Sequence, residues 1–92
     1  PQQWLVDLAG LEELQGNYDA AEKNYRAALH QASDHVVALN NLAFLLALQN
    51  RDLTSAAEFI DKAVALAGPT PALLDTRARV ALAQERLDSA RG

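Results

Sequence analysis

The chain has 92 residues, of which 50% are apolar and 22% charged, and its formal net charge is −4 at pH 7. These values are typical of one small globular domain or a part of one, and the acidic balance argues against nucleic acid as a partner. Cysteine is absent, which excludes disulfides, thiolate metal sites and a cysteine nucleophile.

The longest strongly apolar run, around residues 39–48, is too short to span a bilayer, so no direct membrane insertion is expected. Secretory and lipidation signals are not visible. The chain starts at Pro1 without a methionine, and its helical pattern still continues near Gly92. We therefore expect a segment of a longer protein, and the sequence does not decide between a cytoplasmic and an exported location.

Apolar residues recur at spacings of three and four almost throughout, and alanine and leucine dominate, so the sequence predicts helices nearly everywhere. In chain order, the expected helices cover about 2–15, 18–32, 35–49, 53–67 and 71–84, with a sixth beginning at 87. Their similar lengths and very short connections predict antiparallel neighbours.

Turn and cap residues separate these helices at regular intervals. The expected breaks lie at Gly16-Asn17, Ser33-Asp34, Asn50-Arg51-Asp52 and Gly68-Pro69. Ser33 and Asp34 offer side-chain oxygens for the first amides of the third helix. Before the fifth helix, Thr70 is the expected N-cap, with Pro71 at the first helical position, where its missing N–H has no cost.

The sequence also repeats itself. Three apolar residues recur 34 residues later: Leu5, Leu8 and Ala9 as Leu39, Leu42 and Ala43. Five more recur 35 residues later: Tyr18, Ala21, Tyr25, Ala28 and Leu29 as Leu53, Ala56, Ile60, Ala63 and Val64. Leu39 and Ala43 recur again as Leu74 and Ala78, and Ala56 as Ala90. A helix-turn-helix period of this length indicates stacked helical repeats.

At these positions the chain resembles the tetratricopeptide repeat (TPR) family, in the style of bacterial arrays. The stretches that carry the resemblance are "GNYDAAEKNYRAAL" (16–29), "NNLAFLLALQNRDLTSAAEFIDKAVALAGPTP" (40–71) and "PALLDTRARVALA" (71–83). The resemblance implies an all-α, right-handed solenoid of antiparallel helix-turn-helix repeats. It implies a single domain, 1–92, with repeats at about 2–35 and 36–70 and a truncated third from 71 to 92. Arg77 and Glu85 depart from the family pattern in that third repeat.

Packing of small residues against large ones follows from the repeat. The small positions Ala9, Ala21, Ala43, Ala56, Ala78 and Ala90 are expected to let helix axes approach closely. The large residues expected to fill the space between helix pairs are Tyr18, Tyr25, Leu53 and Ile60. Helix 35–49 is apolar nearly all round, which predicts burial on both sides. If no second helix completes the third repeat, apolar surface on helix 71–84 should be exposed and should favour self-association.

Several residues of catalytic type are better explained without chemistry. Ser33-Asp34-His35 are adjacent and cannot form a hydrolase relay, and His30 with His35 lacks a third metal ligand. Neighbouring Glu12 and Glu13 diverge on a helix and are expected to be solvated. With only four glycines there is no phosphate-binding loop. The sequence therefore predicts no enzyme, no cofactor and no metal, with Tyr18 and Tyr25 in the core.

The family resemblance implies a protein-interaction scaffold that binds a peptide or partner helix in the concave groove. The expected groove residues are Val37, Asn40, Asn41, Phe44, Leu48, Asp75 and Arg79, with Val6, Asp7, Gly10, Glu13, Thr76 and Leu82 at further groove slots. Asn41 and Arg79 are the main expected polar contacts, although Asn41 could instead bond a neighbouring helix. The clamp that some family members use for acidic chaperone tails is not expected, because Asp75 would repel a carboxylate.

Two alternatives remain open. The repeats could be purely structural or capping units of a larger TPR protein, with no ligand of their own, or an accessory domain of a catalytic parent. Lone Trp4 could cover the first helix pair or pack on a preceding repeat. Residues 1–22 carry five acids and no basic residue, whereas arginines concentrate near the other end. Such opposite charges favour head-to-tail stacking, and so a homo-oligomer formed through the solenoid ends.

Overall fold

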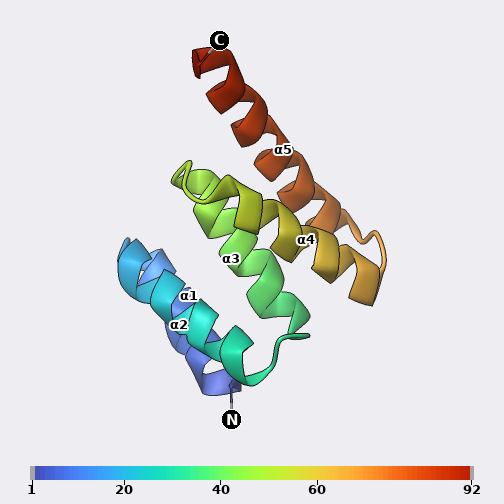
Figure 1. Ribbon diagram of the computed structural model, residues 1–92. Coiled ribbons are helices and arrows are strands. Elements are labelled where there is room, and N and C mark those ends of the chain that lie inside the picture. The colour runs from blue at the N-terminus through green and yellow to red at the C-terminus, as the bar shows by residue number, and fades with distance from the viewer. Residues whose placement is uncertain (1, 92) are drawn as a thin grey trace.

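The computed structural model describes residues 2–91 and folds them into five α-helices joined by short turns (Figure 1). The helices are α1 (Gln3–Leu14), α2 (Tyr18–Gln31), α3 (Val36–Leu48), α4 (Leu53–Ala67) and α5 (Pro71–Arg91). No strand occurs within residues 2–91, so the prediction of an all-α chain is confirmed. Pro1 and Gly92 lie outside the described residues.

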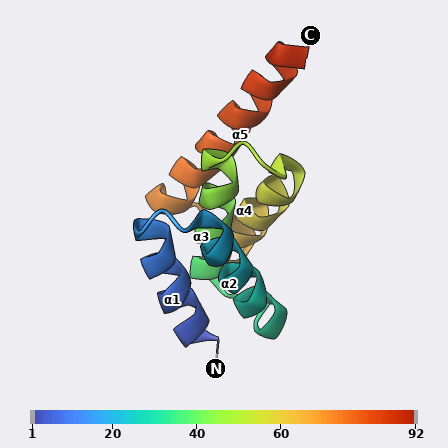
Figure 2. The ribbon, with the colours of Figure 1, turned by 90° about the vertical axis from the view of Figure 1, so that its left-hand side faces the viewer.

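Consecutive helices pair as neighbours, with α1 against α2, α3 against α4 and α4 against α5. Helix α3 lies in the middle and contacts all four other helices, whereas α1 and α5 lie at opposite ends of the molecule (Figures 1 and 2). This central position explains why α3 is apolar nearly all round: a helix with neighbours on several sides has little face left for polar residues.

The core forms around the small residues of the repeat. Ala9, Ala21, Ala43 and Ala56 are completely buried, as their spacing predicts. Tyr25 and Ile60 are buried against them, while Tyr18 packs at the edge of the core. Small and large side chains therefore alternate where helices meet, which fills the interior without separating the helix axes.

The predicted turns at Gly16 and Gly68 are confirmed by their positive φ values of 80° and 87°, a backbone region that glycine adopts without strain. Thr70 caps α5 as expected, because its Oγ1 accepts a hydrogen bond from the Leu73 amide at 3.3 Å.

The cap of α3 differs from the prediction. His35 precedes this helix and accepts from the Ala38 amide through Nδ1 at 3.2 Å, so the expected role of Ser33 and Asp34 was wrong. The imidazole nitrogen stands in the position where a carboxylate or hydroxyl oxygen usually accepts this bond.

An ion-pair network holds the α3–α4 turn against α2. Arg51 lies 2.9 Å from Glu22, which also accepts from Arg26 at 3.0 Å. Arg26 in turn reaches Asp52 at 3.0 Å. Arg51 and Asp52 belong to the turn, whereas Arg26 and Glu22 belong to α2. The helix pairs α1–α2 and α3–α4 are therefore connected by ion pairs as well as by apolar packing.

The end of the chain differs from the prediction. Helix α5 continues without interruption to Arg91, so the expected break after residue 84 and the sixth helix were wrong. Residues 81–90 contain neither glycine nor proline and consist largely of helix formers, so no local signal ends the helix. Ala78 and Ala90 are exposed rather than close-packed, because among the described residues no helix lies against that side of α5.

Candidate functional site

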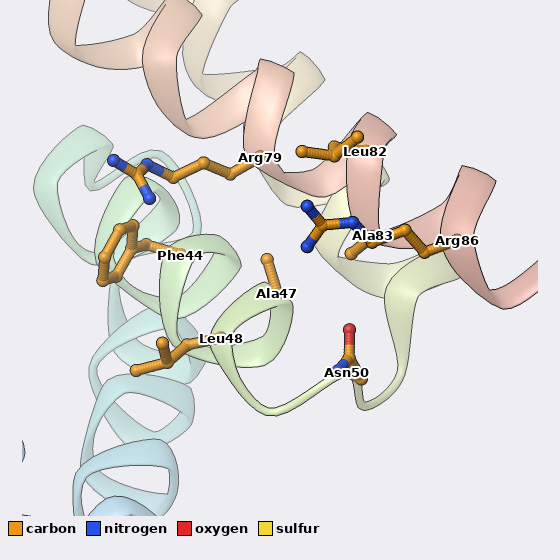
Figure 3. A pocket seen from close by; sticks show the side chains of 8 residues that line it. All are labelled: Phe44, Ala47, Leu48, Asn50, Arg79, Leu82, Ala83 and Arg86. Carbon is orange, nitrogen blue, oxygen red and sulfur yellow. The ribbon is translucent and has the colours of Figure 1, made fainter.

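A hollow of about 210 Å³ lies between α3 and α5 (Figure 3). Its lining is apolar in the middle and basic on the α5 side; the residues are Phe44, Ala47, Leu48, Asn50, Arg79, Leu82, Ala83 and Arg86. Three of the residues expected in the groove, Phe44, Leu48 and Arg79, are thus brought together with Leu82. This combination of apolar surface with a few polar groups is typical of sites that bind small molecules or single peptide side chains.

Arg79 is already held in place within this hollow. Its Nε donates to Asp75 Oδ2 at 2.9 Å, one helical turn away on the same helix. Its guanidinium carbon lies 5.4 Å from the centre of the Phe44 ring, within the range of a cation–π contact (Figure 3). Asp75 therefore positions Arg79 over Phe44.

Arg86 is different, since its side chain makes no ion pair or hydrogen bond with another residue in 2–91. Its side chain reaches from α5 toward α3, as that of Arg79 does (Figure 3). The guanidinium therefore keeps all five N–H donors available for a ligand.

Arg86 was missed by the sequence reasoning, together with Ala47, Asn50 and Ala83. A signal existed, because Arg86 follows Arg79 by seven residues and so lies on the same face of a continuous helix. The predicted break after residue 84 concealed that relation.

The other predicted residues of α3 lie farther from the hollow. Val37 is exposed at the start of the helix, while Asn40 and Asn41 are half-buried. Asn40 donates to Asn41 Oδ1 at 3.3 Å, and its own Oδ1 is buried without a hydrogen-bond partner in residues 2–91. The two amides therefore bond each other rather than both facing outward.

Tyr25 of α2 is bonded to α1 through its hydroxyl. The ring is completely buried, and the hydroxyl donates to Glu13 Oε1 at 3.0 Å. Burial raises the pKa of Tyr25 well above its usual value, and the negative charge of Glu13 raises this pKa further, while a hydrogen bond from Asn41 opposes these effects. Tyr25 is thus a structural residue that ties α2 to α1.

Two residues expected at groove slots are inside the protein. Val6 is buried in the core, and Thr76 is buried with its hydroxyl donating to the Ala72 carbonyl at 3.3 Å, so neither can touch a ligand. Gly10 lies beside the Tyr25 hydroxyl, 3.8 Å from where a Cβ would be placed. The prediction for Val6 and Thr76 was wrong. Aligning the sequence with the repeat pattern does not specify the rotation of each helix about its own axis, and this rotation decides which side chains face the groove.

The residues of catalytic type lie where their chemistry is used for structure. His35 caps α3 through Nδ1, and its Nε2 lies 3.1 Å from Gln3 Oε1. Glu12 accepts a hydrogen bond from Asn24 at 2.6 Å, which ties α1 to α2. Over residues 2–91, no three histidine, cysteine or acidic side chains come together as a metal site would require.

None of the five helices combines the length and the apolar character needed to cross a membrane, as far as residues 2–91 are concerned.

Comparisons of the chain with models of protein families, with curated proteins and with solved structures return no match.

Proposed function

We propose that this chain is a TPR-type interaction module whose hollow between α3 and α5 binds a peptide segment of a partner protein. The observation that carries the proposal is the hollow itself, where Phe44, Leu48 and Leu82 surround the space and two arginines border it. Peptide grooves of helical-repeat proteins combine such apolar pockets with charged groups that fix the ligand's orientation.

The helix pairs support the TPR assignment. Positions that correspond in the two repeats are buried alike, with Ala9 and Ala43 on the first helices and Ala21 and Ala56 on the second. Repeats that bury the same small positions stack in one manner, which favours a right-handed solenoid. The proposed role involves no catalysis, and a protein or peptide is the proposed partner.

The hollow favours a ligand that presents an apolar side chain next to a carboxylate. An aliphatic or aromatic group would occupy the space beside Phe44 and Leu48. Arg86, which has open donors, would bind the carboxylate through two parallel hydrogen bonds. Arg79 would contribute less to binding the carboxylate, because its guanidinium already donates to Asp75 and lies against the Phe44 ring.

A random-peptide phage library selected against the purified protein tests this function. We expect enriched peptides to contain an apolar residue close to Asp or Glu. Synthetic fluorescein-labelled copies should lose roughly tenfold or more in affinity for Phe44→Ala and Arg86→Gln, the range of central interface residues. Leu66→Ala, at an exposed leucine outside the hollow, should bind normally. If no peptide is enriched, or if both hollow variants bind unchanged while remaining helical, the proposal is wrong.

A purely structural or capping role is the second candidate. The observation that favours it is that both end helices, α1 and α5, expose apolar side chains. Under this alternative the hollow would have no ligand, and the phage selection would return no common motif.

A further inference from the structure

The turn between α3 and α4 places a residue of unusual backbone conformation at the edge of the hollow. Asn50 lines the hollow and has a φ of 53°, in the left-handed region that favours glycine. Its amide donates to the Ala47 carbonyl at 3.1 Å, and the Arg51 amide donates to the Leu46 carbonyl at 3.0 Å, which is a regular way to end a helix. Glycine would make the same backbone bonds with less strain, so the backbone does not explain why asparagine is present.

The equivalent turn of the first helix pair has glycine at this position. Gly16 precedes Asn50 by one repeat period of 34 residues, and its φ is 80°. The amide of Gly16 and the amide of the next residue donate to α1 carbonyls in the same pattern, at 3.0 and 2.8 Å. Of these two turns, only the one beside the hollow carries a side chain in the strained position. Strain of this kind persists at functional sites.

The Asn50 carboxamide is open to a ligand. The residue is exposed, and its side chain forms no hydrogen bond with another residue in 2–91. It points from the turn toward the hollow, where Arg86 reaches in from α5 (Figure 3). Among the hollow's lining side chains in the described part of the chain, Asn50 alone carries a hydrogen-bond acceptor, since the two arginines only donate and the others are apolar.

Building on the proposed function, on which this step rests, we propose that Asn50 accepts a hydrogen bond from a backbone N–H of the bound peptide and so selects an extended segment rather than a helix. A peptide group that enters the hollow beside Arg86 loses water, and its N–H then needs an acceptor. The Asn50 oxygen provides it. Within a helix the backbone N–H groups are bonded to the helix's own carbonyls, so an extended segment is the form that presents one to Asn50.

Three variants test the role of the carboxamide, with the fluorescein-labelled peptide enriched by the phage selection as the probe. Asn50→Gly should weaken its binding roughly three- to tenfold, the range of one hydrogen bond. Stability in urea unfolding should stay equal or rise, because glycine adopts this φ without strain. Asn50→Asp keeps a residue that tolerates the conformation but brings a carboxylate beside Arg86, so it should weaken binding more than Asn50→Gly does.

Asp52→Gly is the matched control. Asp52 belongs to the same turn and has a φ of 46°, but it lies outside the hollow. This variant loses the ion pair with Arg26 and loosens the turn, yet it keeps the Asn50 carboxamide. Its affinity for the probe should therefore equal that of the wild-type protein, and far-UV circular dichroism verifies that each variant remains helical.

Analogues of the probe identify the bonded group and the ligand's conformation. In each analogue one backbone N–H is methylated, and one analogue should bind the wild-type protein roughly three- to tenfold more weakly than the probe does. The same analogue should lose little against Asn50→Gly, because that protein already lacks the acceptor. The circular dichroism of the complex should equal the sum of the separate spectra, since an extended peptide gains no helix on binding.

The outcomes separate this role of Asn50 from the peptide site itself. If Arg86→Gln weakens binding while Asn50→Gly or Asn50→Asp binds unchanged, the role of Asn50 is wrong and the peptide site stands. An Asp52→Gly protein that loses as much affinity as Asn50→Gly would also overturn this role, because a loosened turn would explain both losses. A gain of helix on binding would exclude the extended ligand. If no peptide binds the wild-type protein, both proposals are wrong.

Discussion

Removing the Tyr25 hydroxyl measures how much its hydrogen bond to Glu13 stabilises the fold. The hydroxyl donates to Glu13 Oε1 at 3.0 Å and lies in a completely buried residue. Tyr25→Phe keeps the ring and so leaves no cavity, but it deprives the Glu13 carboxylate of a donor. A hydrogen bond to a charged group contributes about 1.5–3 kcal/mol. Because Glu13 is half-buried and water can replace part of the bond, we expect a loss of about 1.5 kcal/mol.

For a chain of this length, that loss corresponds to a fall in Tm of roughly 6–12 °C. Urea unfolding followed by far-UV circular dichroism measures it. Tyr18→Phe removes the same atom from a half-buried tyrosine at the edge of the core and should change stability by less than about 0.5 kcal/mol. The double variant Tyr25→Phe, Glu13→Gln should be less destabilised than the sum of the single changes, by about 1 kcal/mol.

The same bond gives a prediction about alkaline pH. The pKa of Tyr25 is raised in the folded protein. The contribution of protonated Tyr25 to the free energy of unfolding is therefore complete below the unfolded pKa of 10.0, and this contribution declines as pH rises above that value. Tyr25→Phe should therefore flatten the loss of stability above about pH 10. Two results would refute the role assigned to this hydroxyl. One is a double variant whose loss of stability equals the sum of the Tyr25→Phe and Glu13→Gln losses, and the other is a Tyr25→Phe protein whose stability falls above about pH 10 as that of the wild type does.

Three further outcomes are expected. Leu46→Ala, at a completely buried position of α3, should destabilise the protein by about 2–5 kcal/mol in urea unfolding, whereas Leu66→Ala at the surface should have little effect. Gly16→Ala should cost roughly 1–2 kcal/mol, because φ is 80° while an added Cβ meets nothing within 4 Å, so a neutral change would contradict the strain argument. A hydrogen bond with the Ser55 side chain lowers the pKa of Asp52 in the folded protein. The ionised Asp52 carboxylate therefore stabilises the fold above the unfolded pKa, and this stabilisation is lost as pH falls through the folded pKa. Ser55→Ala should make stability less sensitive to pH on the acidic side, and an unchanged acid titration would count against this contact.

Most of the helical framework could be predicted from the sequence, because its signals are local. Gly16 and Gly68 end helices through their own backbone freedom, and Thr70 caps the helix that follows it. The burial of Ala21 and Ala56 followed from the repeat, since equivalent positions in stacked units meet equivalent neighbours.

The candidate site was less predictable. Phe44, Leu48 and Arg79 were anticipated, but Arg86 joined them only because α5 runs on without a break. Val6 and Thr76 were misplaced because helix rotation depends on contacts with several other helices at once. Such contacts involve residues distant in the chain, which a periodic pattern does not specify.

The sequence by itself determined where the five observed helices begin, which faces are apolar and which residues are small enough for close packing, although it also predicted a sixth helix that does not form. Only the tertiary structure decided which apolar faces are covered, where the Tyr25 hydroxyl is bound and which arginine remains open beside Phe44. The physical reason is that periodicity and capping act over one or two helical turns. Burial and hydrogen-bond partners instead depend on which helices come to lie side by side.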